Sequence, residues 1–142
     1  MNEDVIISER LQRLAEETAY LKNERDALAR FEDYRNNTRL KKAVERSLQV
    51  AIEICFDIGQ RIISVEGLRL ANSYRETFLI LQEAGILAPG QGERLANMAS
   101  FRNLLVHDYV RIDDERVYAI LKRRLGDFES FAAAIAAYLK GQ

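Results

Sequence analysis

Apolar side chains recur along most of the chain at intervals of three and four residues, which is the period of an amphipathic α-helix. Between residues 7 and 28, five of the seven stripe positions are apolar; the seven are Ile7, Leu11, Leu14, Thr18, Leu21, Arg25 and Leu28. Charged side chains fill most of the positions between them. The pattern predicts a long first helix over residues 7–28.

A second stripe follows after the polar interruption at residues 36–38, and Thr38 is expected to cap its helix. Its members are Leu40, Val44, Leu48, Ala51, Cys55, Ile58, Ile62 and Val65. Gly67 then marks the expected end of the helix, because glycine readily takes the left-handed conformation that closes helices. Further on, Ser73 and Glu76 have the spacing of a capping box, which predicts a short helix from Ser73 to Gly85.

Two more helices complete the prediction after a turn over residues 86–92, which holds the only proline. The fourth carries an apolar stripe and is expected to end near Tyr109; the stripe is Leu95, Met98, Ala99, Leu105 and Val106. The fifth is expected to begin with the acidic side chains at 113–115, which the positive end of a helix dipole favours, and to end near Lys140. Its predicted buried stripe is Val117, Leu121, Leu125, Phe128, Phe131, Ile135 and Tyr138.

The whole pattern predicts an all-α protein, an antiparallel up-and-down bundle of four main helices plus one short helix. One proline, seven glycines and the absence of hairpin signals agree with that class. A chain of 142 residues, 48% of them hydrophobic, is the usual size of one domain, so we expect a single domain over residues 1–142.

Composition narrows the range of functions. The chain has 21 Lys and Arg against 22 Asp and Glu, which argues against a general polyanion binder, so a nucleic-acid site would have to be local. Its one cysteine cannot form an internal disulfide, and the sequence has neither a secretion signal nor a long apolar run. We therefore expect a cytoplasmic protein that does not associate with a membrane.

The candidate catalytic residues lie close together at residues 100–110, "SFRNLLVHDYV", a segment that contains the only histidine. On a continuous helix, Asn103 and His107 would be neighbours, and the long side chain of Arg102 could reach toward them. Two interpretations stay open: a histidine that satisfies backbone carbonyls at a helix end, or an anion site with a titratable group beside it. One histidine without a second makes a poor transition-metal site, so we expect neither metal nor cofactor.

Three ordered blocks of sequence, together about half the chain, resemble the HepT-type toxins of the HEPN superfamily. They are "RLKKAVERSLQVAIEICFDIGQRII" at 39–63, "SYRETFLILQEAGIL" at 73–87 and "LANMASFRNLLVHDYV" at 95–110. The last block contains the family motif R-x-x-x-x-H-x-Y, formed here by Arg102, His107 and Tyr109.

The resemblance implies a metal-independent endoribonuclease toxin that acts as a homodimer, with Arg102 and His107 working on the scissile phosphate and Asn103 supporting them. It also implies that a cognate nucleotidyltransferase antitoxin inactivates the toxin by adding AMP to Tyr109. The homodimer agrees with chemistry, because RNA cleavage needs both a base and an acid, and a two-fold axis would bring two copies of His107 together. The alternative is a non-catalytic helical partner subunit, which binds a nucleotidyltransferase without cutting RNA.

Basic residues gather early in the second predicted helix, where Arg39, Lys41, Lys42 and Arg46 are candidates for contact with an RNA substrate, mRNA or tRNA. Tyr34 could add a base-stacking surface or be part of the structure. A smaller basic cluster lies at 122–124. For each cluster a solvated helix face is the competing interpretation.

Overall fold

The computed structural model describes residues 2–107 and 111–141, and all the regular structure in these residues is α-helical. The helices are α1 (Glu3–Ala27), α2 (Phe31–Arg35), α3 (Thr38–Glu66), α4 (Tyr74–Glu83), α5 (Gln91–Leu105), α6 (Asp114–Arg123) and α7 (Leu125–Lys140). None of these helices is long and apolar enough to cross a membrane.

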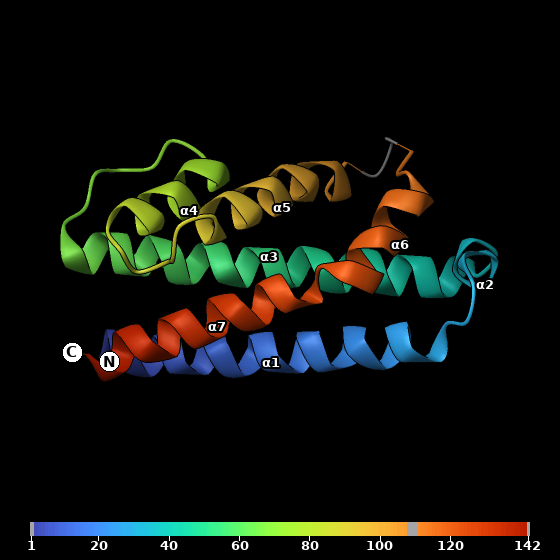
Figure 1. Ribbon diagram of the computed structural model, residues 1–142, viewed down its shortest axis with the longest axis horizontal. Helices are drawn as coiled ribbons and strands as arrows, with labels where there is room; N and C mark the ends of the chain where they lie inside the picture. The colour runs from blue at the N-terminus through green and yellow to red at the C-terminus, as the bar shows by residue number, and fades with distance from the viewer. Residues whose placement is uncertain (1, 108–110, 142) are drawn as a thin grey trace.

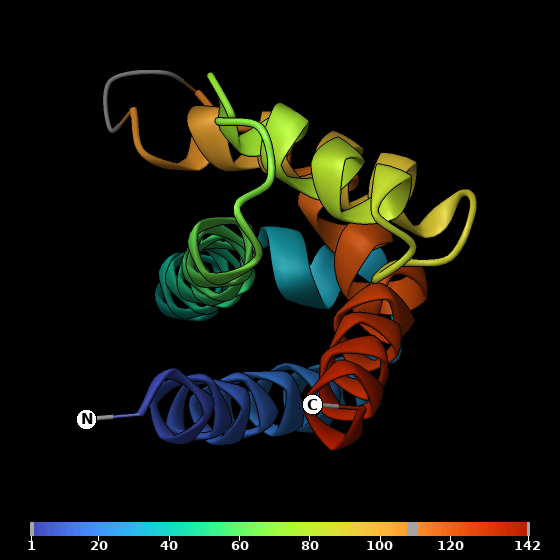
Figure 2. The same cartoon turned by 90° about the vertical axis from the view of Figure 1, so that its left-hand side faces the viewer.

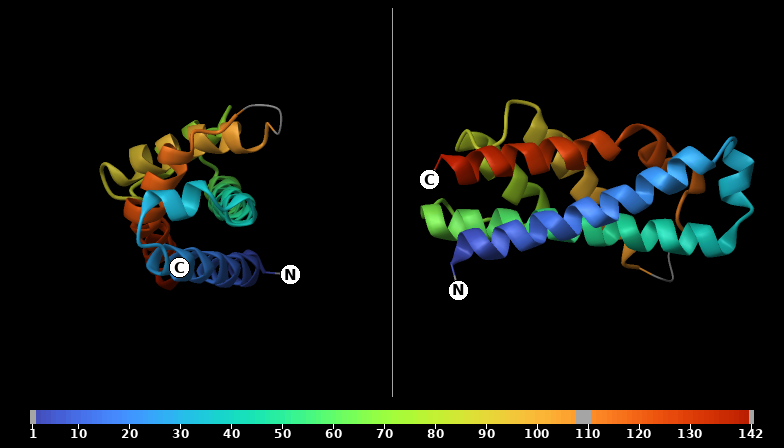
Figure 3. Two further views of the ribbon diagram at one scale, coloured as in Figure 1. Left: turned by 90° about the vertical axis from the view of Figure 1, so that its right-hand side faces the viewer. Right: turned by 90° about the horizontal axis from the view of Figure 1, so that it is seen from below.

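The long helices alternate in direction, and this confirms the predicted all-α up-and-down arrangement. In Figure 1, α1 and α5 run one way while α3 and α7 run the other, with the short α4 beside α5. Seen along the bundle, α1 and α3 lie on one side, α7 lies on the other, and α4 and α5 cover the top (Figure 2). Helix α2 lies at the end remote from both termini, where the chain turns from α1 into α3 (Figure 3).

The core is formed by the apolar stripes of all the long helices. Phe78 of α4 and Phe131 of α7 meet edge to face with ring centroids 6.1 Å apart, so helices far apart in sequence share one interior. Every member of the predicted stripe of α3 is buried except the two at its ends, Leu40 and Val65. The prediction of that helix is confirmed, including its end at Gly67, which has the expected positive φ of 64°.

Helix ends are where prediction and structure differ. The N-cap of α3 is Asn37, not Thr38: the Asn37 side chain accepts a hydrogen bond from the backbone N–H of Leu40 at 3.0 Å. The single helix predicted from Asp113 to Lys140 is divided at Arg124. This division lets α6 pack against α2 while α7 turns to pack along α1.

Contacts with α4 fix the start of α5, the helix that carries Arg102. At its start, the side-chain oxygen of Gln82 in α4 accepts hydrogen bonds from the backbone N–H groups of Gly90 and Gly92, at 3.1 and 2.8 Å. Close packing explains Gly92, because a Cβ there would lie 2.6 Å from the carbonyl oxygen of Phe78. At its other end α5 stops at Leu105, so the prediction of a helix continuing to near Tyr109 is wrong.

Candidate functional site

His107 lies just beyond the end of α5 instead of on it. Val106 is the C-cap of α5, and the backbone N–H of His107 donates to the carbonyl of Leu104 at 3.4 Å. The expected helical pairing of Asn103 with His107 therefore does not apply. Both side chains are exposed.

A cleft of about 870 Å³ is lined by His107 together with residues from the first half of α3 and from the start of α6. Its charged lining consists of four cations, Lys41, Lys42, Arg46 and Arg111, and two carboxylates, Glu45 and Asp114. The cleft therefore has a net positive lining in a nearly neutral protein, and such a lining attracts phosphate groups.

The four predicted RNA contacts do not all belong to this cleft. Lys42 and Arg46 are exposed in it, whereas Lys41 forms an ion pair with Asp114 at 3.1 Å that ties α3 to α6. Arg39 is exposed on α3 and is not among the described lining residues. Sequence reasoning missed Arg111, which stands apart from both basic clusters and comes to the cleft only through the fold.

Tyr34 is buried beside the cleft, and Glu45 in its lining is half-buried. Tyr34 is fully buried, with its ring 5.9 Å from that of Tyr118, so the base-stacking interpretation is wrong. Burial, together with the nearby charges of Glu45 and Asp114, raises the pKa of the Tyr34 hydroxyl. Burial and the charge of Asp114 also raise the pKa of Glu45, against the opposing effect of Lys41 and Lys42. The protein interior next to the cleft is therefore a region of low polarity, which disfavours the charged forms of both groups.

Arg102 points from α5 toward α3, where it is held by Glu53. Its Nε donates to Glu53 Oε2 at 3.1 Å, and its Nη2 donates to the same oxygen. The guanidinium also lies over the ring of Tyr74, 4.7 Å from the centroid, and Tyr74 stacks on Phe56 at 3.7 Å. Only 20% of the Arg102 side chain is exposed, so contacts from α3 and α4 set its position.

Glu53 is the partner of Arg102 that the sequence did not reveal, because it lies 49 residues from Arg102 in the chain and carries no motif. Gln49 connects the two regions: its side chain lines the cleft of His107 and its Nε2 lies 3.4 Å from Glu53 Oε2. Arg102 itself is not among the described lining residues of that cleft. Within one chain, the structure thus brings His107 together with Lys42 and Arg46 but directs Arg102 to Glu53.

The predicted AMP acceptor, Tyr109, lies outside the described residues. Among those that are described, no cluster of three or more His, Cys, Asp or Glu side chains is arranged to hold a metal ion. The single cysteine, Cys55, is buried in the core, where burial raises the pKa of its thiol.

Comparisons with known proteins give the family of this chain. The family model "Ribonuclease HepT-like" matches residues 6–135. A curated relative, the "tRNA nuclease HepT" of Aphanizomenon flos-aquae, is 30% identical over 139 residues, which is 96% of this chain and 92% of the relative. The "mRNA nuclease HepT" of Shewanella oneidensis is 29% identical over 104 residues, covering 73% of this chain and 78% of the relative. The chain therefore belongs to the HepT-like ribonuclease family, as the motif suggested.

Solved structures share the fold. A Shewanella oneidensis HEPN toxin, described as tri-AMPylated and in complex with an MNT antitoxin, superimposes with a TM-score of 0.78 at 24% identity, over 96% of this chain and 99% of that one. The Bacillus subtilis protein YutE, described as cytosolic, superimposes with a TM-score of 0.82 at 21% identity, over 96% and 90% of the two chains. At these identities the likeness shows the common helical architecture.

Proposed function

We propose that this protein is an endoribonuclease, the toxin of a toxin–antitoxin pair, and that it cleaves RNA without a metal ion. Membership of the HepT-like ribonuclease family carries this proposal, since two curated relatives are named as nucleases of mRNA and tRNA. The cationic cleft beside His107 supports it, because cleavage of a phosphodiester requires positive charge near the phosphoryl oxygens.

In this proposal His107 transfers protons and Arg102 stabilises the scissile phosphate. Cleavage by the neighbouring 2′-hydroxyl needs a base that takes its proton and an acid that protonates the leaving 5′-oxygen. Arg102 uses Nε and one Nη2 hydrogen on Glu53, so its Nη1 hydrogens remain for a phosphate oxygen. Exposed Asn103, the next residue on α5, would support the bound phosphate as a hydrogen-bond donor.

The catalytic unit in this proposal is a homodimer. One chain carries one histidine, and a single imidazole cannot act as base and acid at the same moment. Within one chain Arg102 is directed to Glu53, away from the cleft that His107 lines. A two-fold axis near the end of α5 would join two copies of each residue in a composite site, with one imidazole as base and its mate as acid.

The antitoxin in this proposal is a nucleotidyltransferase that adds AMP to Tyr109. A structurally similar toxin is described as AMPylated and bound to an MNT antitoxin, and that description motivates the assignment. Tyr109 follows His107 by two residues. A bulky phosphate ester there would compete with RNA for the cations of the cleft and switch the site off. Mass spectrometry of the protein co-expressed with its antitoxin should find AMP on the wild type and none on Tyr109→Phe.

The nuclease proposal is tested by incubating the purified protein with total tRNA and with mRNA in buffer containing EDTA. The wild type should cleave, and His107→Ala should lose about 10²–10⁴-fold in rate, the usual contribution of an acid–base group. Arg102→Ala should lose about 10²–10³-fold, as for a lost transition-state donor. Asn103→Ala should lose less than either.

The cleft offers a matched comparison among basic residues. Lys42→Ala and Arg46→Ala remove charges that line the cleft, so each should raise KM with little change in kcat. Arg39→Ala removes a charge outside the lining and should have the smallest effect. If the wild type cuts neither RNA yet binds its nucleotidyltransferase, the alternative of a non-catalytic partner subunit replaces this proposal.

A further inference from the structure

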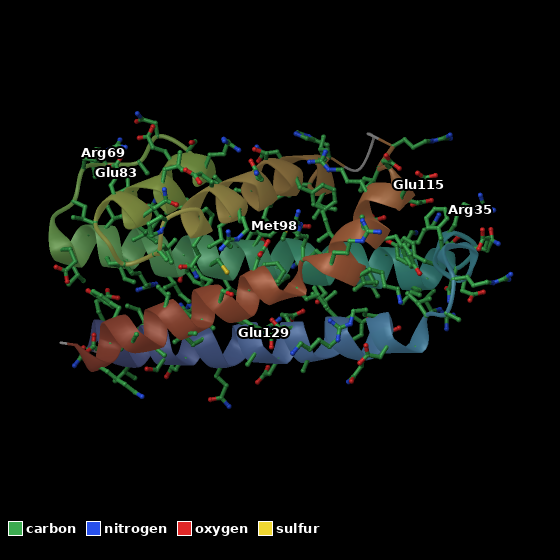
Figure 4. All side chains as sticks on the ribbon, viewed as in Figure 1. Arg35, Arg69, Glu83, Met98, Glu115 and Glu129 are labelled. Carbon is green, nitrogen blue, oxygen red and sulfur yellow. The ribbon has the colours of Figure 1, made fainter. Side chains whose placement is uncertain are left out.

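A second cationic pocket lies between α5, α6 and the start of α7. Its volume is about 180 Å³, and its apolar floor consists of Met98, Phe101 and Ile120. Figure 4 shows Met98 in the space between the ribbons of α5 and α7. Phe101 and Arg102 are consecutive, yet Phe101 contacts Arg116 of α6 whereas Arg102 reaches Glu53 of α3. The pocket and the Arg102 site are therefore on different sides of α5.

Three arginines, Arg94, Arg116 and Arg124, line this pocket with one carboxylate, Asp127. The Arg116 guanidinium lies over the Phe101 ring, 5.0 Å from its centroid. Arg94 Nε lies 3.6 Å from an Asp127 oxygen. Within the described part of the chain, neither Arg116 nor Arg124 has a carboxylate within 4.0 Å. Arg116 and Arg124 thus form no short ion pair, although the charge of Arg124 acts on Asp127: burial raises the pKa of that carboxyl, and Arg124 opposes this larger effect.

The basic cluster at 122–124, which the proposed function does not use, is divided by the fold. Lys122 is structural, because its Nζ donates to the carbonyl oxygens of Arg25 and Leu28 at 2.9 and 2.8 Å and so closes the end of α1. Arg123 is exposed and is not among the described lining residues. Arg124 lines the pocket and directly precedes α7, whose positive dipole end adds to its charge.

We propose that this pocket binds the phosphate group of a nucleotide. Guanidinium groups present parallel N–H donors that match phosphate oxygens, and the three arginines of this pocket are exposed, so a phosphate can reach them. Asn97 adds a side-chain amide to the same lining. A pocket of about 180 Å³ has room for one small group such as a phosphate. The same chemistry fits a free nucleotide or one phosphate of an RNA that passes the mouth of the pocket.

The test is an NMR titration of the full-length protein in metal-free buffer with three probes: inorganic phosphate, AMP, and a 2′-O-methyl RNA octamer that lacks the attacking hydroxyl. Each probe that binds should shift the backbone amide signals of residues 124–127 and of Phe101. If AMP binds more tightly than the octamer, the phosphate that the pocket binds belongs to a free nucleotide. If the octamer binds more tightly, it belongs to an RNA strand. Either order supports the phosphate site.

Adjacent residues supply the matched control. Arg116→Gln and Arg124→Gln should each weaken binding about tenfold, the effect of one charge-assisted hydrogen bond. Arg123→Gln makes the same change one residue away and should leave the affinity unchanged. Asp127→Asn removes the one carboxylate of the lining and should tighten binding. A thermal melt of each variant verifies folding.

The proposal is overturned if Arg124→Gln binds as tightly as Arg123→Gln, if shifts occur only around the cleft of His107, or if the wild type binds none of the probes. Because the octamer cannot be cut, this result does not depend on nuclease activity. Binding at residues 124–127 by a protein that leaves RNA intact would keep the pocket and refute the proposed function. RNA cleavage by a protein that shows no binding at residues 124–127 would keep the proposed nuclease function and refute the phosphate pocket.

Discussion

Replacing Glu53 with glutamine breaks the same ion pair as replacing Arg102 with glutamine, but it leaves the arginine in the protein. Glu53 Oε2 accepts from both Nε and Nη2 of Arg102, so each variant loses the charge pairing between α3 and α5. The comparison therefore separates the structural role of Arg102 from its proposed catalytic role.

The expected loss of stability follows from the burial of the pair. The side chains of Arg102 and Glu53 are 20% and 31% exposed. The contribution of their pair to stability should therefore lie between that of a surface ion pair, about 0.2–1 kcal/mol, and that of a buried charged hydrogen bond, about 1.5–3 kcal/mol. We expect each single variant to lose about 1.5 kcal/mol of unfolding free energy. The double variant should lose less than the sum, because the second change removes no further pairing. For a chain of this length that loss lowers Tm by about 5 °C.

Unfolding in urea measures the stabilities, and the EDTA nuclease assay at 25 °C, well below either Tm, measures the rates. Glu53→Gln should keep cleavage within about tenfold of the wild type, since its amide oxygen can still accept from Arg102 and the stack on Tyr74 remains. Arg102→Gln should lose about 10²–10³-fold. Equal losses of activity in the two variants would mean that Arg102 acts only through structure, and the reasoning would be refuted.

Three further predictions concern the neighbouring residues. The Tyr34 hydroxyl is buried with no hydrogen-bond partner among the described residues, so Tyr34→Phe should raise the unfolding free energy by about 1 kcal/mol, and a lower Tm in a thermal scan would contradict this. The raised pKa of Glu45 means that the folded protein binds that proton more tightly than the unfolded chain, so the carboxylate destabilises the fold at neutral pH. Glu45→Gln should therefore melt at a higher temperature than the wild type at pH 7. This difference in Tm should shrink as the pH falls through the raised pKa toward the ordinary glutamate pKa. A difference in Tm that grows on acidification would contradict the prediction. Gly92→Ala should lose about 1–3 kcal/mol in urea unfolding, because its Cβ would meet the Phe78 carbonyl oxygen at 2.6 Å, and Gly126→Ala, with open space around it, is the control.

Periodicity predicted the interiors of the helices better than their ends. The stripe of α3 and the Ser73 cap of α4 follow from local spacing, and both are as expected. The apolar stripe of α5 continues to Val106, which is half-buried, and no glycine or proline follows Leu105 directly. Nothing in the sequence therefore marks the end of the helix at Leu105. The break at Arg124 has a tertiary cause, the packing of α6 on α2 and of α7 on α1.

The candidate site could be predicted only as far as its motif. Arg102 and His107 were found because a motif places them five residues apart, but their spacing did not reveal that they face different surroundings. Glu53 and Tyr74 have no local signal and reach the region through packing of α3 and α4, and Arg111 comes to it from the segment just before α6. A pattern read along one chain cannot supply such contacts, since they depend on how helices pair.

The central claim is that two protomers share one composite site, and a mixed dimer tests it most directly. Two differently tagged chains, one wild type and one His107→Ala, are co-expressed, purified through both tags and assayed on RNA in EDTA. A composite site that needs both imidazoles predicts activity reduced at least about 10²-fold from the wild-type homodimer. Half the wild-type activity would show that each chain cuts RNA on its own, which would contradict the account.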